Sequence, residues 1–141
     1  MGCHLSLPSR FDQLRRFRYS GWMDSQAPTS AAPDDFIVVL VTVPDQDLAV
    51  ALARTLVEEK LIACVNILPG VRSIYAWQGK VCDDSELLCV LKTRRALFEA
   101  VRARVTALHP YQVPEIVALP LVEGNPPYLA WLEKETHDGS P

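Results

Sequence analysis

The sequence predicts an α+β fold in which two helices back a sheet of four antiparallel strands, and three observations lead to that prediction. Apolar, β-branched stretches alternate with two stretches of helical periodicity in the order βαββαβ. Proline or glycine stands near most of the boundaries between these stretches. A final short stretch carries prolines in its first turn and predicts a terminal helix. This order of elements is that of the ferredoxin-like arrangement.

The chain has 141 residues, a length that suits a single domain. Residues 1–35 are arginine-rich and then Ser/Pro/Ala-rich, which is typical of a disordered extension or of a non-native one preceding a start at Met23. An organelle transit peptide and an acylation signal at Gly2 are the competing interpretations. We predict that residues 36–136 form the folded domain and that residues 137–141 are a tail.

The first strand and helix have clear local signals. Residues 36–43 are an unbroken, mostly β-branched run, which predicts a central strand buried on both faces. Asp45 is placed to cap a helix that continues to about Lys60. Leucines at a spacing of four residues, beside alanines, give this helix one apolar face that we expect to pack on the sheet.

The next two strands form an unusually long hairpin. Residues 62–77 read as one strand, which Pro69 and Gly70 bend without ending its pairing. After a tight turn the third strand runs back from Val81 through residues 86–92. The far half of this hairpin leaves unpaired edges with apolar side chains, which soluble proteins cover. We therefore predict a homo-oligomer.

The remaining elements complete the predicted order. A second amphipathic helix opens at Arg94 or Arg95 and ends at His109, because the proline that follows disfavours helical geometry before it. Residues 113–122 predict the fourth strand. Residues 126–135 predict the short terminal helix.

The composition excludes several classes of partner and activity. A net charge of −3 lacks the basic excess of a nucleic-acid-binding protein, and every apolar run is broken before the roughly 18 residues of a membrane span. We expect neither nucleic acid nor a membrane as a partner. The four cysteines form no CxxC pair and are typical of reduced thiols in a cytoplasmic protein. Without a nucleophile motif, phosphate loop, HExxH motif or facing carboxylate pair, we expect no enzymatic activity.

The densest polar cluster spans residues 109–115, on a stretch that two prolines stiffen. Within it His109 and Glu115 are candidate ligands of a divalent transition metal, and Tyr111 lies between them. A stable site needs three or four protein donors, and this segment offers two. In the alternative interpretation, which the residues alone favour, His109 stabilises the helix C-terminus and Glu115 is a solvated strand residue.

A second group of candidates lies on the hairpin. Tyr75 and Trp77 occupy alternate positions and point to one face, where they would line a cleft or pack against a neighbouring chain. Packing is the favoured interpretation. Lys92 on the opposite arm would anchor an anion or reach solvent from the strand end.

Six segments, in order and at matching spacing, resemble the CutA family of divalent-cation tolerance proteins. The resemblance covers residues 36–136. It implies a ferredoxin-like homotrimer whose long hairpins pair across subunits, similar in architecture to the PII signalling proteins, and an association with copper tolerance. The segments are PD at 44–45, LIACVNILPG at 61–70, SIYAWQGK at 73–80, LKT at 91–93, HPYQVPEI at 109–116 and YLAWL at 128–132.

From the resemblance we expect a cytoplasmic homotrimer that binds Cu²⁺, another divalent cation or a small ligand in an inter-subunit cleft. The metal ligands would be His109 and Glu115. The cleft would be lined by Tyr75, Trp77, Lys92 and Tyr111, with some of these from a neighbouring subunit. The alternative is a trimeric signalling or anchoring scaffold for another protein, without a metal function.

The resemblance also implies a specific copper site, to which this sequence contributes one of three ligands. In bacterial members the implied ligands are a cysteine on the first strand and a His-His pair before the Pro-Tyr. The matching positions here are Val41, Leu108 and His109. The soft thiolate that would best select copper is therefore missing.

Overall fold

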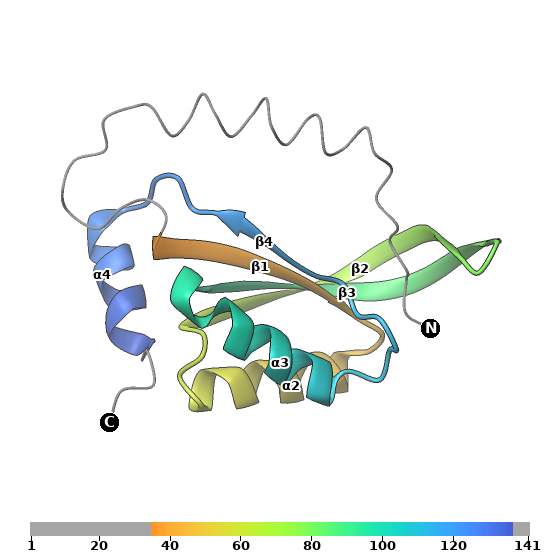
Figure 1. Ribbon diagram of the computed structural model, residues 1–141, viewed down its shortest axis with the longest axis horizontal. Helices are drawn as coiled ribbons and strands as arrows, with labels where there is room; N and C mark the ends of the chain where they lie inside the picture. Colours follow the sequence, from red (N-terminus) through yellow and green to blue (C-terminus); the bar gives the residue numbers. More distant parts are fainter. Residues whose placement is uncertain (1–34, 137–141) are drawn as a thin grey trace.

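The computed structural model describes residues 35–136, which form a four-stranded antiparallel sheet with helices α2 and α3 on one face and α4 at one end (Figure 1). The strand order is β2-β3-β1-β4, which confirms the predicted α+β, ferredoxin-like fold. The interpretations of residues 1–34 and 137–141 fall outside the described residues. The elements are β1 (Phe36–Val43), α2 (Gln46–Glu58), β2 (Cys64–Trp77), β3 (Lys80–Arg94), α3 (Phe98–Leu108), β4 (Ile116–Pro120) and α4 (Pro126–Glu135).

Strand β1 is central, as predicted, and pairs with both β3 and β4. Its odd-numbered residues, including Val39, Val41 and Val43, are fully buried beneath the helices. The even-numbered residues Val38 and Leu40 are only half-buried. Burial on both faces is therefore a wrong prediction for most of the strand in the single chain. Helices α2 and α3 cover one face of the sheet, whereas on the other face Phe36 is buried with Leu132 of α4 and the residues after it are not.

Helix α2 begins at the predicted cap. The Asp45 carboxylate accepts a hydrogen bond from the Leu48 amide at 2.8 Å, which satisfies one of the free donors of the first turn. Leu52 and Leu56 are buried against the sheet. The helix ends at Glu58, slightly before the predicted position, and Lys60 then adopts a left-handed backbone with φ of 60°.

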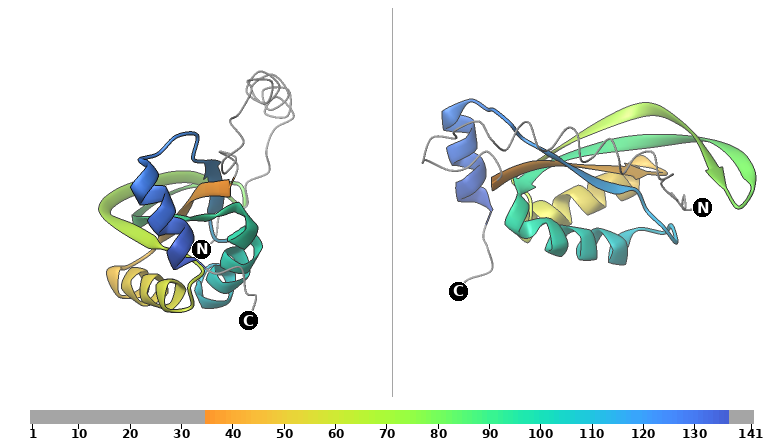
Figure 2. Two further views of the ribbon diagram at one scale, coloured as in Figure 1. Left: turned by 90° about the vertical axis from the view of Figure 1, so that its left-hand side faces the viewer. Right: turned by 45° about the horizontal axis from the view of Figure 1, so that its top comes forward.

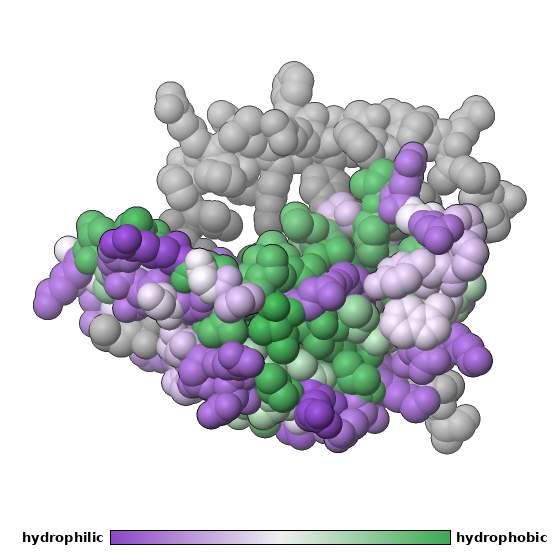
Figure 3. All heavy atoms as spheres, turned by 180° about the vertical axis from the view of Figure 1, so that it is seen from behind, coloured by the Kyte–Doolittle hydropathy of each residue, from purple (hydrophilic) through white to green (hydrophobic). Residues whose placement is uncertain are grey.

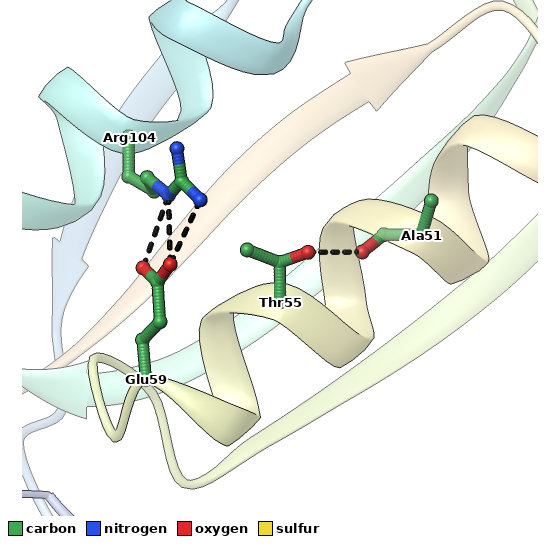
Figure 4. Close-up of polar contacts among 4 residues, drawn as sticks. All are labelled: Ala51, Thr55, Glu59 and Arg104. Atoms are coloured by element: carbon green, nitrogen blue, oxygen red, sulfur yellow. Dashed lines mark hydrogen bonds and ion pairs between the residues drawn. The ribbon is translucent and has the colours of Figure 1, made fainter.

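Helices α2 and α3 lie side by side and are joined at the surface by an ion pair (Figure 4). The Nε of Arg104 on α3 lies 3.0 Å from both carboxylate oxygens of Glu59, which follows α2. Beneath this pair Val101 and Val105 of α3 are fully buried in the core. The helix pair is thus held mainly by apolar packing, with a charged contact outside it.

The β2–β3 hairpin extends well beyond the rest of the sheet (Figure 2). Its pairing register shifts between Leu68 and Val71, so Pro69 and Gly70 bend the strand without ending it, as predicted. Strand β3 is continuous from Lys80 to Arg94, slightly longer at each end than the predicted strand from Val81 to residue 92.

Cross-strand polar contacts explain this continuity. Arg72 on β2 donates two hydrogen bonds to Asp83, at 2.8 and 2.6 Å. The Tyr75 hydroxyl donates to Asp84. The two acidic residues that interrupt the apolar pattern of β3 are thus paired across the hairpin, and the ladder continues through them.

The last elements close the fold. Strand β4 pairs with β1 over Ile116–Pro120 only, so the predicted strand at residues 113–122 was too long at both ends. The residues before it belong to the loop that follows α3, and beyond Pro120 the Leu121 amide donates one further bond to the Phe36 carbonyl of β1. Helix α4 forms where predicted, and the Arg94 guanidinium donates to Thr136 at its end, with Nε 3.0 Å from the side-chain oxygen.

Two surface features follow from this arrangement. Within residues 35–136, no helix is long and apolar enough to cross a membrane. The side chains most exposed among the large apolar ones are Ile74 at 67% and Val81 at 81%, both on the hairpin. Seen from behind, hydrophobic side chains also gather in the middle of the molecule, between the polar hairpin end and α4 (Figure 3).

Candidate functional site

His109 is held at the C-terminal cap of α3 by hydrogen bonds to both ring nitrogens. Its Nδ1 accepts a bond from the Tyr111 amide at 3.1 Å, and its Nε2 lies 2.8 Å from the Thr42 carbonyl oxygen. Since Nδ1 accepts and a carbonyl oxygen also only accepts, the proton lies on Nε2. The side chain is 7% exposed. A metal ion could reach a ring nitrogen only if the imidazole gave up one of these bonds.

Tyr111 continues this contact toward the hairpin. Its ring packs against the His109 ring with centroids 4.6 Å apart, and its hydroxyl donates to Oε2 of Glu86 at 3.1 Å. Glu86 belongs to β3 and is 7% exposed. The loop after α3 is thus connected to the base of the hairpin through one aromatic ring and one carboxylate.

Glu115 lies close to the same carboxylate. Partial burial raises the pKa of Glu115, and the negative charge of Glu86 raises it further. None of the salt bridges found within residues 35–136 involves either group. Glu86, which is buried, and Glu115, which is partly buried, therefore form a pair of like charges.

Glu86 is a site residue that was not among the candidates predicted from the sequence. A signal was present, because Glu86 is the acidic residue that opens the otherwise apolar run of residues 86–91. A carboxylate at such a position must find a hydrogen-bond donor or a cation when the strand is buried. Its proximity to Tyr111 and Glu115 depended on the path of the loop after α3, which the pattern did not reveal.

Within one chain the three predicted cleft residues of the hairpin do not meet at His109. Tyr75 contacts Asp84 on the extended arm, and Trp77 lies beside the turn at the tip. Lys92 is six positions from Glu86 along β3, which corresponds to about 20 Å at the rise of a strand. Their contribution to a cleft with a neighbouring subunit stays a prediction.

Other possible sites are weaker. Among the described residues, no group of three or more His, Cys, Asp or Glu side chains is arranged to hold a metal ion. Val41 is fully buried in the core and offers no donor. A hollow of about 290 Å³ lies between Phe98 at the start of α3 and Leu119 in β4, and Glu86 and Glu115 do not line it.

Comparisons with known proteins agree on one family. The family model described as CutA1 divalent ion tolerance protein matches residues 37–135. The divalent-cation tolerance protein CutA of Thermus thermophilus is 58% identical over 99 residues, which cover 70% of this chain and 96% of that protein. Mouse protein CutA is 42% identical over 125 residues, covering 86% of this chain and 71% of its own length.

Solved structures give the same result. The crystal structure of CutA1 from Oryza sativa superimposes with a TM-score of 0.72 at 48% identity, covering 73% of this chain and 94% of that one. The Thermus thermophilus structure has a TM-score of 0.71 at 56% identity and covers 72% of this chain and 99% of that one. None of these names is that of an enzyme.

Proposed function

The chain belongs to the CutA1 divalent ion tolerance family, and from this premise we propose that it binds a divalent cation at Glu86 and Glu115 as a homotrimer. The observation that carries the proposal is the Tyr111–Glu86 hydrogen bond, which brings the buried Glu86 carboxylate to the segment that holds Glu115. The charge of Glu86 also adds to partial burial in raising the pKa of Glu115. A divalent cation between them would replace a repulsion by two attractions. The proposal keeps the predicted ligand Glu115 and adds Glu86.

The donor chemistry supports a cation that takes oxygen ligands. Two carboxylates provide up to four oxygens, and water or a neighbouring subunit would complete the coordination. Oε2 of Glu86 accepts the Tyr111 hydroxyl, and in this proposal Oε1 is the oxygen that contacts the cation.

His109 and Tyr111 position this pair. The imidazole is fixed by Thr42, and the Tyr111 amide and ring are fixed by the imidazole. The Tyr111 hydroxyl then holds Oε2 of Glu86. In this proposal His109 does not bind the metal and acts by orienting Tyr111.

Calorimetric titration tests the proposal. At neutral pH we expect wild-type protein to bind Cu²⁺, Zn²⁺ and Mn²⁺, with Cu²⁺ the tightest of the three. Glu115→Gln should weaken each affinity by about tenfold or more, since one of two charged donors is lost. Glu123→Gln is the matched control, because it makes the same chemical change at an exposed carboxylate outside the pair. Equal affinities for wild type and Glu115→Gln would refute the proposal.

The proposed assembly is supported by the apolar surface of the single chain. Leu119 of the edge strand β4 is 52% exposed, and Ile74 and Val81 of the hairpin are more exposed still. Such side chains and the open edges of β2 and β4 would be covered in a trimer. That the proposed oligomer has three subunits is taken from the family resemblance.

Sedimentation velocity tests the assembly separately from metal binding. We expect wild-type protein to sediment at three times the mass of one chain. Val81→Lys should shift the population toward smaller species, because Val81 is 81% exposed in the single chain and its replacement disturbs no packing there. A wild-type protein that sediments as a monomer would contradict the assembly.

A further inference from the structure

A second cluster of reactive groups lies near the C-terminal end of β3, six residues beyond Glu86. Cys64 on β2 and Lys92 on β3 are directly paired residues, and Nζ of Lys92 lies 3.9 Å from Sγ of Cys64. Lys92 also donates to the side-chain carbonyl of Asn66. Asn66 and Cys64 are both on β2, so the bond to Asn66 helps to hold the ammonium group beside the sulfur.

Helix α4 adds a third group. The pKa of the Tyr128 hydroxyl is raised by partial burial, by the charge of Cys64 and by a hydrogen bond to Cys64. The Tyr128 ring also packs against Trp131 with centroids 5.5 Å apart. The thiol is thus contacted by Lys92 of β3, and the raised pKa of Tyr128 indicates that the phenol of α4 lies nearby.

The other described cysteines have different surroundings. Cys89 is fully buried in the core, where burial raises the pKa of its thiol. Cys82 is half-buried on the hairpin, and no hydrogen bond between it and a cationic side chain is found in residues 35–136. Cys64 has comparable partial exposure and has the ammonium of Lys92 beside it.

We propose that Cys64 is a peroxide-sensitive thiol, activated by the ammonium of Lys92 and the hydroxyl of Tyr128. Attack by a thiol proceeds through negatively charged sulfur, which a neighbouring cation and a hydrogen-bond donor stabilise. The sulfur attacks one oxygen of hydrogen peroxide, so that a sulfur–oxygen bond forms while the oxygen–oxygen bond breaks. The sulfur loses two electrons to the peroxide. The leaving hydroxide takes the thiol proton, giving Cys64 sulfenic acid and one water.

Trapping the sulfenic acid with dimedone, followed by mass spectrometry of each cysteine peptide, tests this assignment. At neutral pH Cys64 should be modified about three- to tenfold faster than Cys82, and Cys89 should stay unmodified. Lys92→Met should reduce the Cys64 rate toward that of Cys82, whereas Lys92→Arg, which keeps the charge, should retain most of it. If Cys89 stays unmodified in a variant, the core of that variant is still folded.

Two results with the wild type and Lys92→Met would overturn the proposal. One is a Cys82 rate equal to or above the Cys64 rate in the wild type. The other is an unchanged Cys64 rate in Lys92→Met with Cys89 still protected. If Lys92→Met exposes Cys89, Tyr128→Phe decides instead, because it removes the hydroxyl from a residue that is 38% exposed and should also slow Cys64. An unchanged rate in that variant would contradict the assignment.

Discussion

The Tyr111 hydroxyl donates a hydrogen bond to Oε2 of Glu86 across 3.1 Å, and this contact joins the loop after α3 to the base of the hairpin. Removing the donor by Tyr111→Phe would leave a carboxylate that is 7% exposed without this partner. We expect the free energy of unfolding to fall by about 2 kcal/mol, measured by urea denaturation with chelator present. A change within about 0.5 kcal/mol, the size of an ordinary surface substitution, would show that the contact does not hold Glu86.

The raised pKa of Glu115 predicts a definite pH dependence of stability. Because the folded chain binds this proton more tightly than the unfolded chain, its stabilising effect is complete below the ordinary value of 4.5 and is lost as the pH rises through the folded pKa. In metal-free protein, Glu115→Gln should therefore lose less stability than wild type between pH 4 and neutrality. Chemical denaturation at several pH values measures this. Parallel pH profiles for the two proteins would contradict the predicted shift.

The cap of α2 gives a prediction that does not depend on the site. Asp45→Ala removes the acceptor of the Leu48 amide and should lower the free energy of unfolding by about 1 kcal/mol. Asp45→Asn keeps an oxygen acceptor and should recover most of that loss. Thermal or urea unfolding of the three proteins gives the comparison, and equal losses in both variants would argue against the cap.

The ion pair of Glu59 and Arg104 should contribute little. Both side chains are about two-fifths exposed, at 40% and 39%, so water screens their attraction. A double-mutant cycle with Glu59→Gln and Arg104→Met should give a coupling energy of no more than about 1 kcal/mol. A coupling of several kcal/mol would mean that this contact, rather than the apolar layer beneath it, holds α2 against α3.

Features governed by local chemistry could be predicted from the sequence. Asp45 caps the helix that follows it, and Pro69 and Gly70 bend β2, because both effects act over a few residues. The polar pairing along the hairpin could not be predicted in the same way. Arg72 and Asp83 are 11 residues apart in the chain, and the pattern alone does not show that they form a contact.

The site was predictable only in part, for the same reason. His109, Tyr111 and Glu115 lie in one short segment, so the sequence alone predicted them as a group. Glu86 is 25 residues before Tyr111 and enters the site through the tertiary path of the loop. The half-buried face of β1 has a similar origin, since the pattern shows apolar side chains but not which layer covers them.

Anomalous scattering from crystals soaked with Cu²⁺ or Zn²⁺ locates a bound metal without assuming its ligands. We expect an anomalous peak between Glu86 and Glu115, within about 2.0–2.2 Å of a carboxylate oxygen of each for Zn²⁺, with His109 still bonded to the Thr42 carbonyl. A peak at Nε2 of a His109 ring turned away from Thr42, or no peak at the carboxylate pair, would contradict this expectation.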